Sequence, residues 1–458
     1  MTSVGCFEDM RIECAAFIAF PPFADGRISF PEAKESDSGL AEVQLITGEN
    51  GSGKTRLLSA LAAACGNATD LNARHAPIDQ THQLVVAMSR DGKKAAYVRS
   101  ANQILIFESS ADAEEIVDSL KTLNRHEPSV ITKDGAITYL SVSARASNLS
   151  DWKSESKVAA QAYRGTGRVG DHQIVAMQPI APSDPAKDLS FERPQTDDAL
   201  VCQSMANLKL SAAMEFQSGE PRDNCRSIKI TERFEAAISK VTGRSFSFQV
   251  ARHPDLHLEV RWGGASMKLA VLPDGLRSII AWLIACIAKL ESQFPEDPNP
   301  LDIPLILLLD EPESHLHPAW QRQLIPAAQQ LFPNAQIFAV THSPFVISSV
   351  NSGWIHVLRM NEEGLVTADE PIECSKGDSY LDAVEDVLGL TQWYDPETEM
   401  LLAEFRALKK KLVSKNGSLE ELETKASVIG ERSESLKSMM ARELHQIRRN
   451  LPEDVVAQ

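Results

Sequence analysis

Two runs along the chain are apolar at every position, and each ends in polar or charged side chains. They are LILLL at 305–309 and IFAV at 337–340. Strands that are apolar on both faces are typical of a parallel sheet covered by helices on both sides. Residues 273–292 show a helical pattern that is hydrophobic nearly all round, so we expect that helix to be buried. The alternation of such strands with helices predicts an α/β fold.

An earlier strand leads into a glycine-rich loop. Residues 43–47 (VQLIT) run into GENGSGKT at 48–55, and RLLSALAAAC follows as a run of strong helix formers that ends before Gly66. The pattern predicts a strand, a loop and a helix in direct succession.

The remaining pattern predicts four regions. Residues 1–144 form an N-terminal lobe, with short antiparallel strands between 82 and 109 and another strand at 136–142. Residues 145–225 are polar and rich in proline, so we expect an inserted, irregular subdomain. Residues 226–375 form a C-terminal lobe with the two apolar strands. Residues 376–458 carry two apolar stripes at helical spacing, which predict a helical hairpin.

Composition narrows the class of protein. The 458 residues are 43% hydrophobic and 24% charged, a globular mixture that excludes collagen-like and wholly disordered chains. The formal charge of −17 excludes a uniformly basic nucleic-acid coat but leaves open a local contact with DNA phosphates. Acidic residues near the N-terminus argue against a signal peptide, and no apolar run is long enough to span a membrane. We therefore expect a cytoplasmic protein without a membrane partner.

The loop at 48–55 matches GxxxxGK[ST], with Gly48, Gly53, Lys54 and Thr55 in register. In this motif the backbone N–H groups surround phosphate oxygens, the lysine neutralises the β- and γ-phosphates, and the hydroxyl holds Mg²⁺. The alternative is a fortuitous glycine-rich turn. The preceding strand and following helix favour the nucleotide interpretation, because the motif requires that context.

Two adjacent acids end the apolar strand at 305–310. Asp310 is the candidate for the Mg²⁺ shell, and Glu311 is the candidate for orienting the attacking water. A solvated acidic strand end is the alternative. The next apolar strand ends in Thr341 and His342, and parallel strands place their ends at the same edge. We therefore expect His342 near the γ-phosphate, although a lone histidine is more often structural.

Two further patterns are weaker. His315 and His317, close to Glu313, have a poor spacing for metal ligands on a helix, so we do not favour a metal site there. The basic residues at 409–411 and 448–449 leave DNA contact open, but a solvated helix face explains them better.

The order GENGSGKT, LPDGLRS, LILLLDEPESHLHP and THSP resembles the ATP-binding heads of the ABC superfamily. It is most similar to the AAA-family ATPases of the branch that includes SMC proteins, RecF and the OLD ATPases. The resemblance implies an ABC-type head, in which a mixed sheet and a parallel P-loop sheet are flanked by helices. It also implies ATP and Mg²⁺ as cofactors, with Thr55 and Asp310 on the metal and Lys54, Glu311 and His342 as catalytic residues. The nucleotide-binding residues it implies are Gly48, Asn50, Gly51, Ser52, Gly53, Lys54, Thr55, Arg56, Asp274 and Gly275.

In this family LPDGLRS takes the place of the signature motif, which completes the nucleotide site of the opposite subunit. The resemblance therefore implies a homodimer or a higher homo-oligomer. Pro273 stands where the signature usually has serine, which puts a hydroxyl contact to the γ-phosphate in doubt. The glutamine-loop residue has no evident position, although its strand is expected at 137–142.

Lengths exclude two subfamilies. The 221 positions from Lys54 to Gly275 are too many for a plain transporter subunit and too few for the arms of an SMC protein. The 116 residues after His342 show no acidic constellation for the TOPRIM nuclease of OLD proteins.

The stretch from DSYLDAVEDVLGL onward is similar to the tail of ATPase subunits in Septu-type and retron-associated anti-phage systems. Those systems pair an ABC-like head with a separate HNH nuclease. The resemblance implies an ATPase that regulates such an effector. Two alternatives stay open: a RecF-like or SMC-like ATPase that acts directly on DNA, and an ATP-gated scaffold with little turnover, which Pro273 suggests.

Overall fold

The computed structural model divides into two compact units, Met1–Ala383 and Val384–Gln458. The residues that it describes are 10–32, 39–66, 83–90, 93–99, 104–109, 138–140, 159–165, 169–171, 174, 177, 198–219, 221–252, 255–374, 381, 383–389, 393–413 and 418–450.

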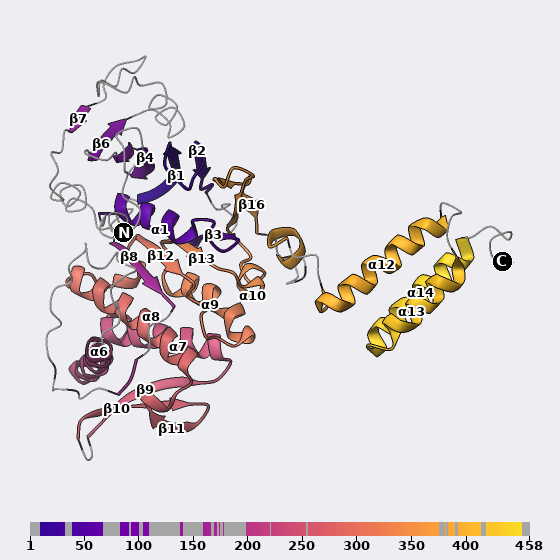
Figure 1. Ribbon diagram of the computed structural model, residues 1–458. Coiled ribbons are helices and arrows are strands. Elements are labelled where there is room, and N and C mark those ends of the chain that lie inside the picture. Colours follow the sequence, from indigo (N-terminus) through magenta and orange to yellow (C-terminus); the bar gives the residue numbers. More distant parts are fainter. Residues whose placement is uncertain are drawn as a thin grey trace. The chain divides into compact units, whose positions relative to one another are not determined.

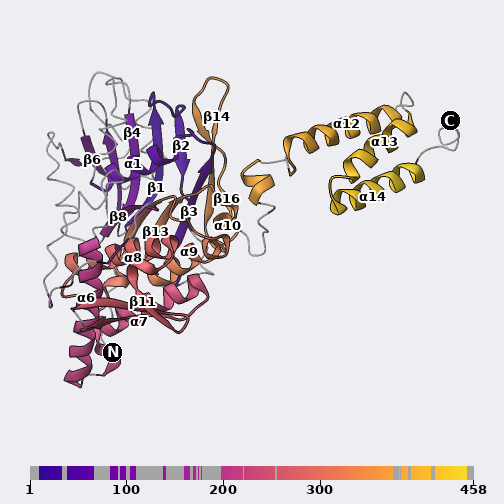
Figure 2. The same cartoon turned by 60° about the horizontal axis from the view of Figure 1, so that its bottom comes forward.

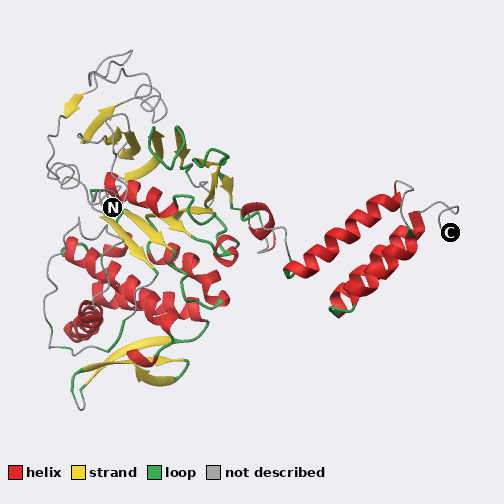
Figure 3. Ribbon diagram, viewed as in Figure 1, coloured by secondary structure: helices red, strands yellow, loops and turns green. Residues whose placement is uncertain are grey.

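A mostly parallel sheet forms the centre of the first unit (Figures 1 and 3). In spatial order its strands are β15 (Val366–Ala368), β14 (Trp354–Met360), β3 (Glu42–Gly48), β13 (Ala335–Val340), β12 (Leu305–Asp310) and β8 (Ala159–Arg164), and β16 (Ile372–Glu373) also pairs with β14. The strands β14, β3, β13, β12 and β8 run parallel to one another, whereas β15 and β16 are antiparallel to β14. The carboxyl ends of the parallel strands therefore meet at one edge.

The two apolar runs of the sequence are the central strands β12 and β13. Every residue of both strands is buried, because each has a strand on either side and helical layers above and below. The prediction of a two-sided apolar parallel sheet is confirmed.

Helix α1 (Lys54–Ala64) packs between this sheet and a second, antiparallel one (Figure 2). The second sheet has the order β2 (Gly26–Ser29), β1 (Met10–Ile18), β4 (Gln83–Arg90), β5 (Lys93–Arg99), β6 (Ile104–Ser109) and β7 (Thr138–Leu140). Leu57 and Leu61 of α1 share one core with Ile12 and Leu84 of the antiparallel sheet and Leu308 of the parallel sheet. This core holds the phosphate-binding end of α1 rigidly between two sheets.

Helices cover the other face of the parallel sheet, and a small sheet lies beyond them (Figure 1). The helices are α6 (Asp198–Ser218), α7 (Arg226–Thr242), α8 (Asp274–Gln293), α9 (Pro318–Leu331) and the short α10 (Pro344–Ile347), with 3₁₀ turns η2 (Arg222–Asn224), η3 (Leu269–Val271) and η4 (Pro300–Asp302). The small sheet has the order β11 (Ala265–Lys268), β10 (His257–Trp262) and β9 (Phe246–Ala251). Helix α8 is buried from Ser278 to Leu290, as its all-round hydrophobic pattern predicts.

The expectation of an irregular insertion in the middle of the chain is incomplete. Residues 145–225 are not only an irregular insertion, since their described part supplies β8 to the central sheet and the 21-residue helix α6. The alanine-rich sequence AAQAYR has little intrinsic strand preference, and burial beside β12 overrides it. The strand expected at 136–142 is confirmed as β7, which pairs antiparallel with β6. At the carboxyl edge of the parallel sheet, the strand beside β12 is β8. The prolines at 179, 182, 185 and 194 lie outside the described residues.

The described part of the second unit contains three helices rather than the expected hairpin. They are α12 (Pro396–Val413), α13 (Leu419–Gly430) and α14 (Glu434–Asn450), and a π-helical turn, η5 (Ala383–Val387), precedes them in the chain. The expected second stripe is split, because α13 ends at Gly430 and the Ser433 hydroxyl accepts from the Leu436 amide at 3.2 Å, which begins a new helix. Leu436 consequently joins the core from α14, together with Leu402, Phe405, Leu422 and Ile429.

One residue of each basic cluster in this unit is paired with an acid. Lys409 Nζ lies 2.6 Å from Glu443 Oε2, and Arg448 Nη2 lies 2.7 Å from Glu423 Oε1. These pairs are what the interpretation as a solvated helix face expects. In neither unit is any described helix both long and apolar enough to cross a bilayer.

Candidate nucleotide-binding site

The loop between β3 and α1 has backbone conformations that favour glycine, most clearly at Gly48 and Gly53. Gly48 has a φ of +145°, and a Cβ atom there would lie 2.2 Å from the carbonyl oxygen of Leu358. Gly53 has a φ of +78° and stands directly before the first turn of α1. The first turn of α1 carries no acidic residue, so nothing there opposes an anion at the positive end of the helix. The conformation is that of a phosphate-binding loop.

The loop residues differ in accessibility. Asn50 and Gly51 are exposed at the tip, whereas Ser52 is buried and its amide donates to the Glu49 carbonyl at 3.2 Å. Arg56, expected beside the nucleotide, extends along α1 with its guanidinium 5.8 Å from the centre of the Phe20 ring. Burial lowers the pKa of Arg56.

Lys54 lies over the loop rather than in solvent. Its Nζ donates to the carbonyl oxygens of Gly48 at 3.0 Å and Glu49 at 2.6 Å, and the residue is only 7% exposed. Burial lowers the pKa of Lys54, and the negative charges of Glu311 and Asp310 oppose that shift. The ammonium group is therefore held at the mouth of the loop, close to both acids, where a phosphate would meet it.

Asp310 and Thr55 form the candidate metal site. The Thr55 hydroxyl donates to the Asp310 carboxylate at 3.2 Å from Oδ1 and 3.4 Å from Oδ2. They meet because β12 ends on the edge where α1 begins. A hydroxyl and a carboxylate supply oxygen atoms, which are the ligands Mg²⁺ prefers, so the residues present fit that ion.

Arg164, at the end of β8, was not predicted as a site residue. Its Nε and Nη2 atoms both donate to Asp310 Oδ2, at 2.9 and 2.6 Å. The pairing register places Arg164 directly beside Asp310 on the neighbouring strand. Sequence analysis missed Arg164 because it lies in the segment assigned as irregular; the signal would have been an arginine immediately after a short buried strand.

Glu311 and His342 face each other at the ends of β12 and β13. His342 Nε2 lies 3.9 Å from Glu311 Oε1, and the two side chains are 36% and 52% exposed. Glu311 has a φ of +50°, a conformation that non-glycine residues adopt with strain, and its amide donates to the Val340 carbonyl at 3.0 Å. Burial and the charge of Lys54 lower the pKa of His342, against the opposing effects of Glu311 and Asp310. The neutral imidazole is the form this site favours near pH 7.

A buried network lies directly behind these two residues. The Thr341 hydroxyl donates to Glu313 and accepts from the Ser343 amide at 3.0 Å, and the Ser343 hydroxyl donates to Gln321 Oε1 at 2.6 Å. Burial raises the pKa of Glu313 to about 7, against the hydrogen bonds it accepts. The network fixes the turn after β12 to the turn after β13.

Asp274 and Gly275 begin α8 and pack against the loop that follows β12. A Cβ atom on Gly275 would lie 2.7 Å from Leu316 Cδ2 and 2.9 Å from the His315 carbonyl oxygen, so the helix start and this loop are in close contact. Asp274 accepts from Arg277 at 2.7 Å. The Ser278 hydroxyl donates to the Gly165 carbonyl at 3.2 Å, which joins α8 to the end of β8.

One histidine of ESHLHP has a conformational role. His317 caps α9, because its Nδ1 accepts from the Ala319 amide at 3.2 Å. Among the residues that the structure describes, no group of three or more His, Cys, Asp or Glu side chains could hold a metal ion.

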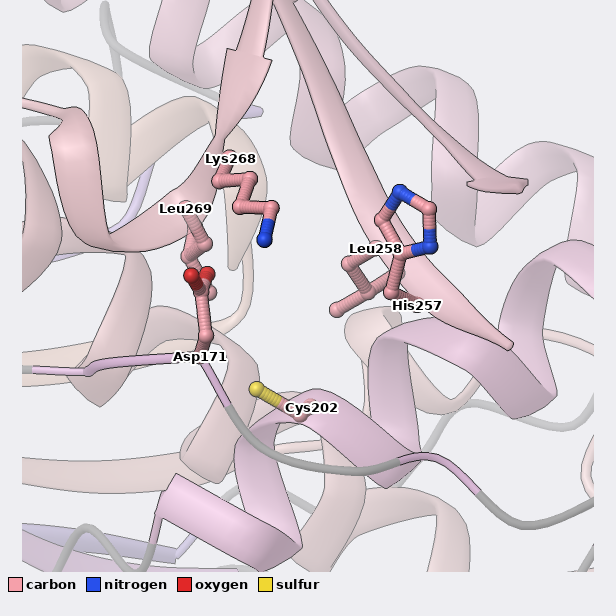
Figure 4. Close-up of a pocket in the computed structure, with 6 residues that line it drawn as sticks. All are labelled: Asp171, Cys202, His257, Leu258, Lys268 and Leu269. Atoms are coloured by element: carbon pink, nitrogen blue, oxygen red, sulfur yellow. The ribbon is translucent and has the colours of Figure 1, made fainter. Parts of the chain in front are cut away.

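A small pocket lies away from the loop, between α6 and the three-stranded sheet (Figure 4). Its volume of about 50 Å³ has room for water but not for a nucleotide. The residues that line it are Asp171, Cys202, His257, Leu258, Lys268 and Leu269.

The chain is similar to several proteins of known family. Relatives include the retron Vc95 probable ATPase of Vibrio cholerae, 26% identical over 38% of this chain and 33% of that protein. The retron Ec83 probable ATPase of Escherichia coli is 33% identical over 26% of this chain and 22% of that protein. The Septu protein PtuA of Bacillus thuringiensis is 25% identical over 36% of this chain and 43% of that protein. The matches thus span less than half the length of each of these relatives.

Solved structures with a similar backbone include the SMC head domain from Thermotoga maritima and the recombination mediator protein RecF. The former has a TM-score of 0.40 at 13% identity, over 79% of this chain and 99% of the other. The latter has a TM-score of 0.36 at 10% identity, over 79% and 98%.

Two family profiles match the sequence. One, described as an AAA domain, covers residues 16–161. The other, described as "AAA domain, putative AbiEii toxin, Type IV TA system", covers residues 96–348, more than half of the chain. The chain therefore belongs to this family of AAA-type P-loop ATPase domains.

Proposed function

We propose that the protein binds and hydrolyses ATP at a dimer interface and that this cycle regulates a separate effector, an HNH-type nuclease, in anti-phage defence. The observation that carries the ATPase part is the convergence of Lys54, Asp310, Glu311 and His342 at one edge of the parallel sheet. These groups come from three different segments of the chain, and hydrolysis uses each of them.

The chemistry follows from the positions of these groups. Lys54 stabilises the charge on the β- and γ-phosphates. Thr55 and Asp310 would hold Mg²⁺, which when bound would supply further positive charge beside the phosphate oxygens. Glu311 orients a water molecule and accepts its proton as the water oxygen bonds to the γ-phosphorus. The bond from phosphorus to the bridging oxygen breaks, and ADP and phosphate leave. His342, favoured in its neutral form, donates a hydrogen bond to a γ-phosphate oxygen.

Dimerisation is proposed because the start of α8 presents an exposed surface. Pro273 and Asp274 are exposed, and Val271 just before them is 69% exposed. In the proposed dimer, Asp274 and Gly275 contact the nucleotide held by the loop of the partner subunit. Pro273 carries no hydroxyl, so backbone groups at the start of α8 make that contact.

The effector part of the proposal is supported by the kinds of protein that the relatives are named as, retron ATPases and a Septu protein. The helical unit 384–458 is the proposed docking region, since it is compact and separate from the ATPase unit.

The test of the ATPase and dimer proposal uses Glu311→Gln and Lys54→Ala. Glu311→Gln removes the proton acceptor but keeps the side-chain volume, so ATP should remain bound and the protein should elute as a dimer with ATP and Mg²⁺. Lys54→Ala should bind no nucleotide and stay in the state seen without ATP. Light scattering after gel filtration measures the oligomeric state of each variant, and phosphate release measures its turnover. A Glu311→Gln substitution that leaves turnover unchanged would reject hydrolysis in favour of the ATP-gated scaffold. A Glu311→Gln variant that stays monomeric with ATP and Mg²⁺ would reject the dimer.

The effector is tested separately, by co-purification of the tagged chain with the products of its neighbouring genes. Recovery of a nuclease, dependent on residues 384–458, supports the proposal. The alternative of a RecF-like ATPase requires salt-sensitive DNA binding by the ATP-bound protein. Lys409 and Arg448 each pair with an acid in the structure, so DNA phosphates would have to compete with Glu443 and Glu423 for these two cations.

A further inference from the structure

Asp310 has a second partner that the proposed hydrolysis does not use. Arg164 directs two N–H groups of its guanidinium onto one carboxylate oxygen, Oδ2, while the Thr55 hydroxyl lies nearer to the other oxygen, Oδ1. A carboxylate oxygen that accepts two short charged hydrogen bonds is held firmly. The proposed metal ligand is therefore also the counter-ion of an arginine.

The environment makes this pair strong. The Asp310 side chain is 4% exposed and the Arg164 side chain is 34% exposed. The carboxylate is therefore nearly buried, whereas the arginine that pairs with it is partly exposed. Charges interact more strongly in such a site than in water. With the guanidinium in place, the site presents a neutral pair to an approaching cation rather than a free negative charge.

Backbone contacts join the strand ends on both sides of the pair, so separating Arg164 from Asp310 requires only a change of the Arg164 rotamer. The Gly165 amide donates to the Asp310 carbonyl at 3.1 Å, and a Cβ atom on Gly165 would lie 2.0 Å from the Glu311 carbonyl oxygen. Ser278 holds the Gly165 carbonyl from α8. The guanidinium, at the end of an unbranched and partly exposed side chain, is free to rotate away from Asp310 while the strand end stays in place.

We infer that Arg164 competes with Mg²⁺ for Asp310 and thereby sets the Mg²⁺ concentration at which nucleotide binds. The inference rests on the proposed function, because it assigns Thr55 and Asp310 to the Mg²⁺ that accompanies ATP. Two cations that draw on one carboxylate oppose each other by linkage: binding of the metal weakens the ion pair, and the ion pair weakens binding of the metal by the same factor. Arg164 is thus a positioning residue that keeps Asp310 neutralised until Mg²⁺ and nucleotide arrive together.

The experiment titrates Mg²⁺ into the full-length chain at a fixed concentration of fluorescent ATP and records the Mg²⁺ concentration at half-maximal binding. Arg164→Gln and Arg164→Met remove the charge, and either variant that folds suffices. We expect half-maximal binding at about tenfold lower Mg²⁺, within the usual range of coupling between two sites. Arg164→Lys keeps a charge near Asp310 and should stay close to the wild type.

Arg233→Gln is the matched control. Arg233 pairs with Asp302 at 2.6 Å with a side chain that is 31% exposed, which resembles the Arg164 pair, but it lies between α7 and η4. Loss of this pair should lower the melting temperature without moving the Mg²⁺ midpoint. A purely structural role for Arg164 would have the same signature, so an unchanged or higher midpoint in the charge-removing variants overturns the inference.

The experiment also separates the inference from the proposed function. A wild-type chain that binds no nucleotide at any Mg²⁺ concentration rejects both. A wild-type chain that binds nucleotide with Mg²⁺, beside Arg164 variants with the same midpoint, rejects the competition alone.

Discussion

Gly165 and Glu311 are in direct backbone contact. They follow Arg164 and Asp310, which are paired across 146 positions of sequence. A Cβ atom on Gly165 would lie 2.0 Å from the Glu311 carbonyl oxygen and 3.0 Å from the Pro312 Cα atom. No side chain fits between these two turns. The contact holds the proposed catalytic acid at its positive φ and joins the ends of β8 and β12.

Gly165→Ala should therefore move the Glu311 turn. The added methyl group meets backbone atoms, which do not rotate away as a side chain does, so the unfolding free energy should fall by about 1–3 kcal/mol or more. ATP hydrolysis should fall further than nucleotide binding, because Glu311 acts in the reaction. Gly26→Ala is the control, since a Cβ atom there meets only one atom, at 4.0 Å. Chemical denaturation measures the stability of the two variants, and phosphate release measures their hydrolysis. Equal stability and equal hydrolysis in Gly165→Ala and Gly26→Ala would contradict the argument.

His342→Ala should lower the rate of hydrolysis by about 100-fold while leaving the affinity for ATP nearly unchanged. A donor that contacts the γ-phosphate mainly in the transition state contributes to the rate more than to binding. Single-turnover phosphate release and equilibrium binding separate the two effects. His445→Ala, at an exposed position of α14, should change neither. Equal losses of rate and affinity in His342→Ala would assign the side chain to ground-state binding.

Leu422→Ala should destabilise the C-terminal helical unit without changing nucleotide affinity. Leu422 is fully buried in the core shared by α12, α13 and α14, and removal of such a side chain costs about 2–5 kcal/mol. Val428 is 44% exposed on the same helix, so Val428→Ala is the control with little expected effect. Hydrogen exchange of residues 396–450 measures the loss. A lower affinity for ATP in Leu422→Ala, but not in Val428→Ala, would show that the unit supports the nucleotide site.

The sequence predicted the parts of the site whose chemistry is local. The loop at 48–55 and the acids after β12 are recognisable because each lies at the junction of a clear strand and a turn or helix. The position of His342 followed from one rule, that parallel strands end at the same edge.

Arg164 could not be predicted in the same way, because its place depends on a distant pairing. The sequence of β8, AAQAYR, consists mainly of small residues and is interrupted by a polar glutamine, so it does not resemble a strand. Only its register with β12 places Arg164 against Asp310. Similarly, the division of the second apolar stripe between α13 and α14 depends on one serine cap, which an unbroken helical pattern conceals. Tertiary pairing and single caps outweigh local propensity at these two points.

Glu313 provides the clearest pH dependence. The residue is 6% exposed, its carboxyl group accepts from the Thr341 hydroxyl, and its Oε2 atom has no described hydrogen-bond partner. Burial is the main cause of its raised pKa of about 7, compared with an ordinary value of 4.5. At a pH between these two values, the native state consequently holds a proton that the unfolded chain has lost.

Stability should therefore fall as pH rises from 4.5 to 7, because the native state binds more protons than the unfolded state in that window. Above pH 7 the penalty is complete, at about 3 kcal/mol from the size of the shift. Glu313→Gln keeps the shape, removes the ionisation and should abolish this part of the slope, so the variant gains stability relative to the wild type as pH rises to 8. Urea denaturation of both proteins at half-unit steps of pH measures the difference. Parallel curves would mean that Glu313 is already ionised in the folded protein at pH 5, and that the Thr341 hydroxyl and neighbouring amides outweigh its burial.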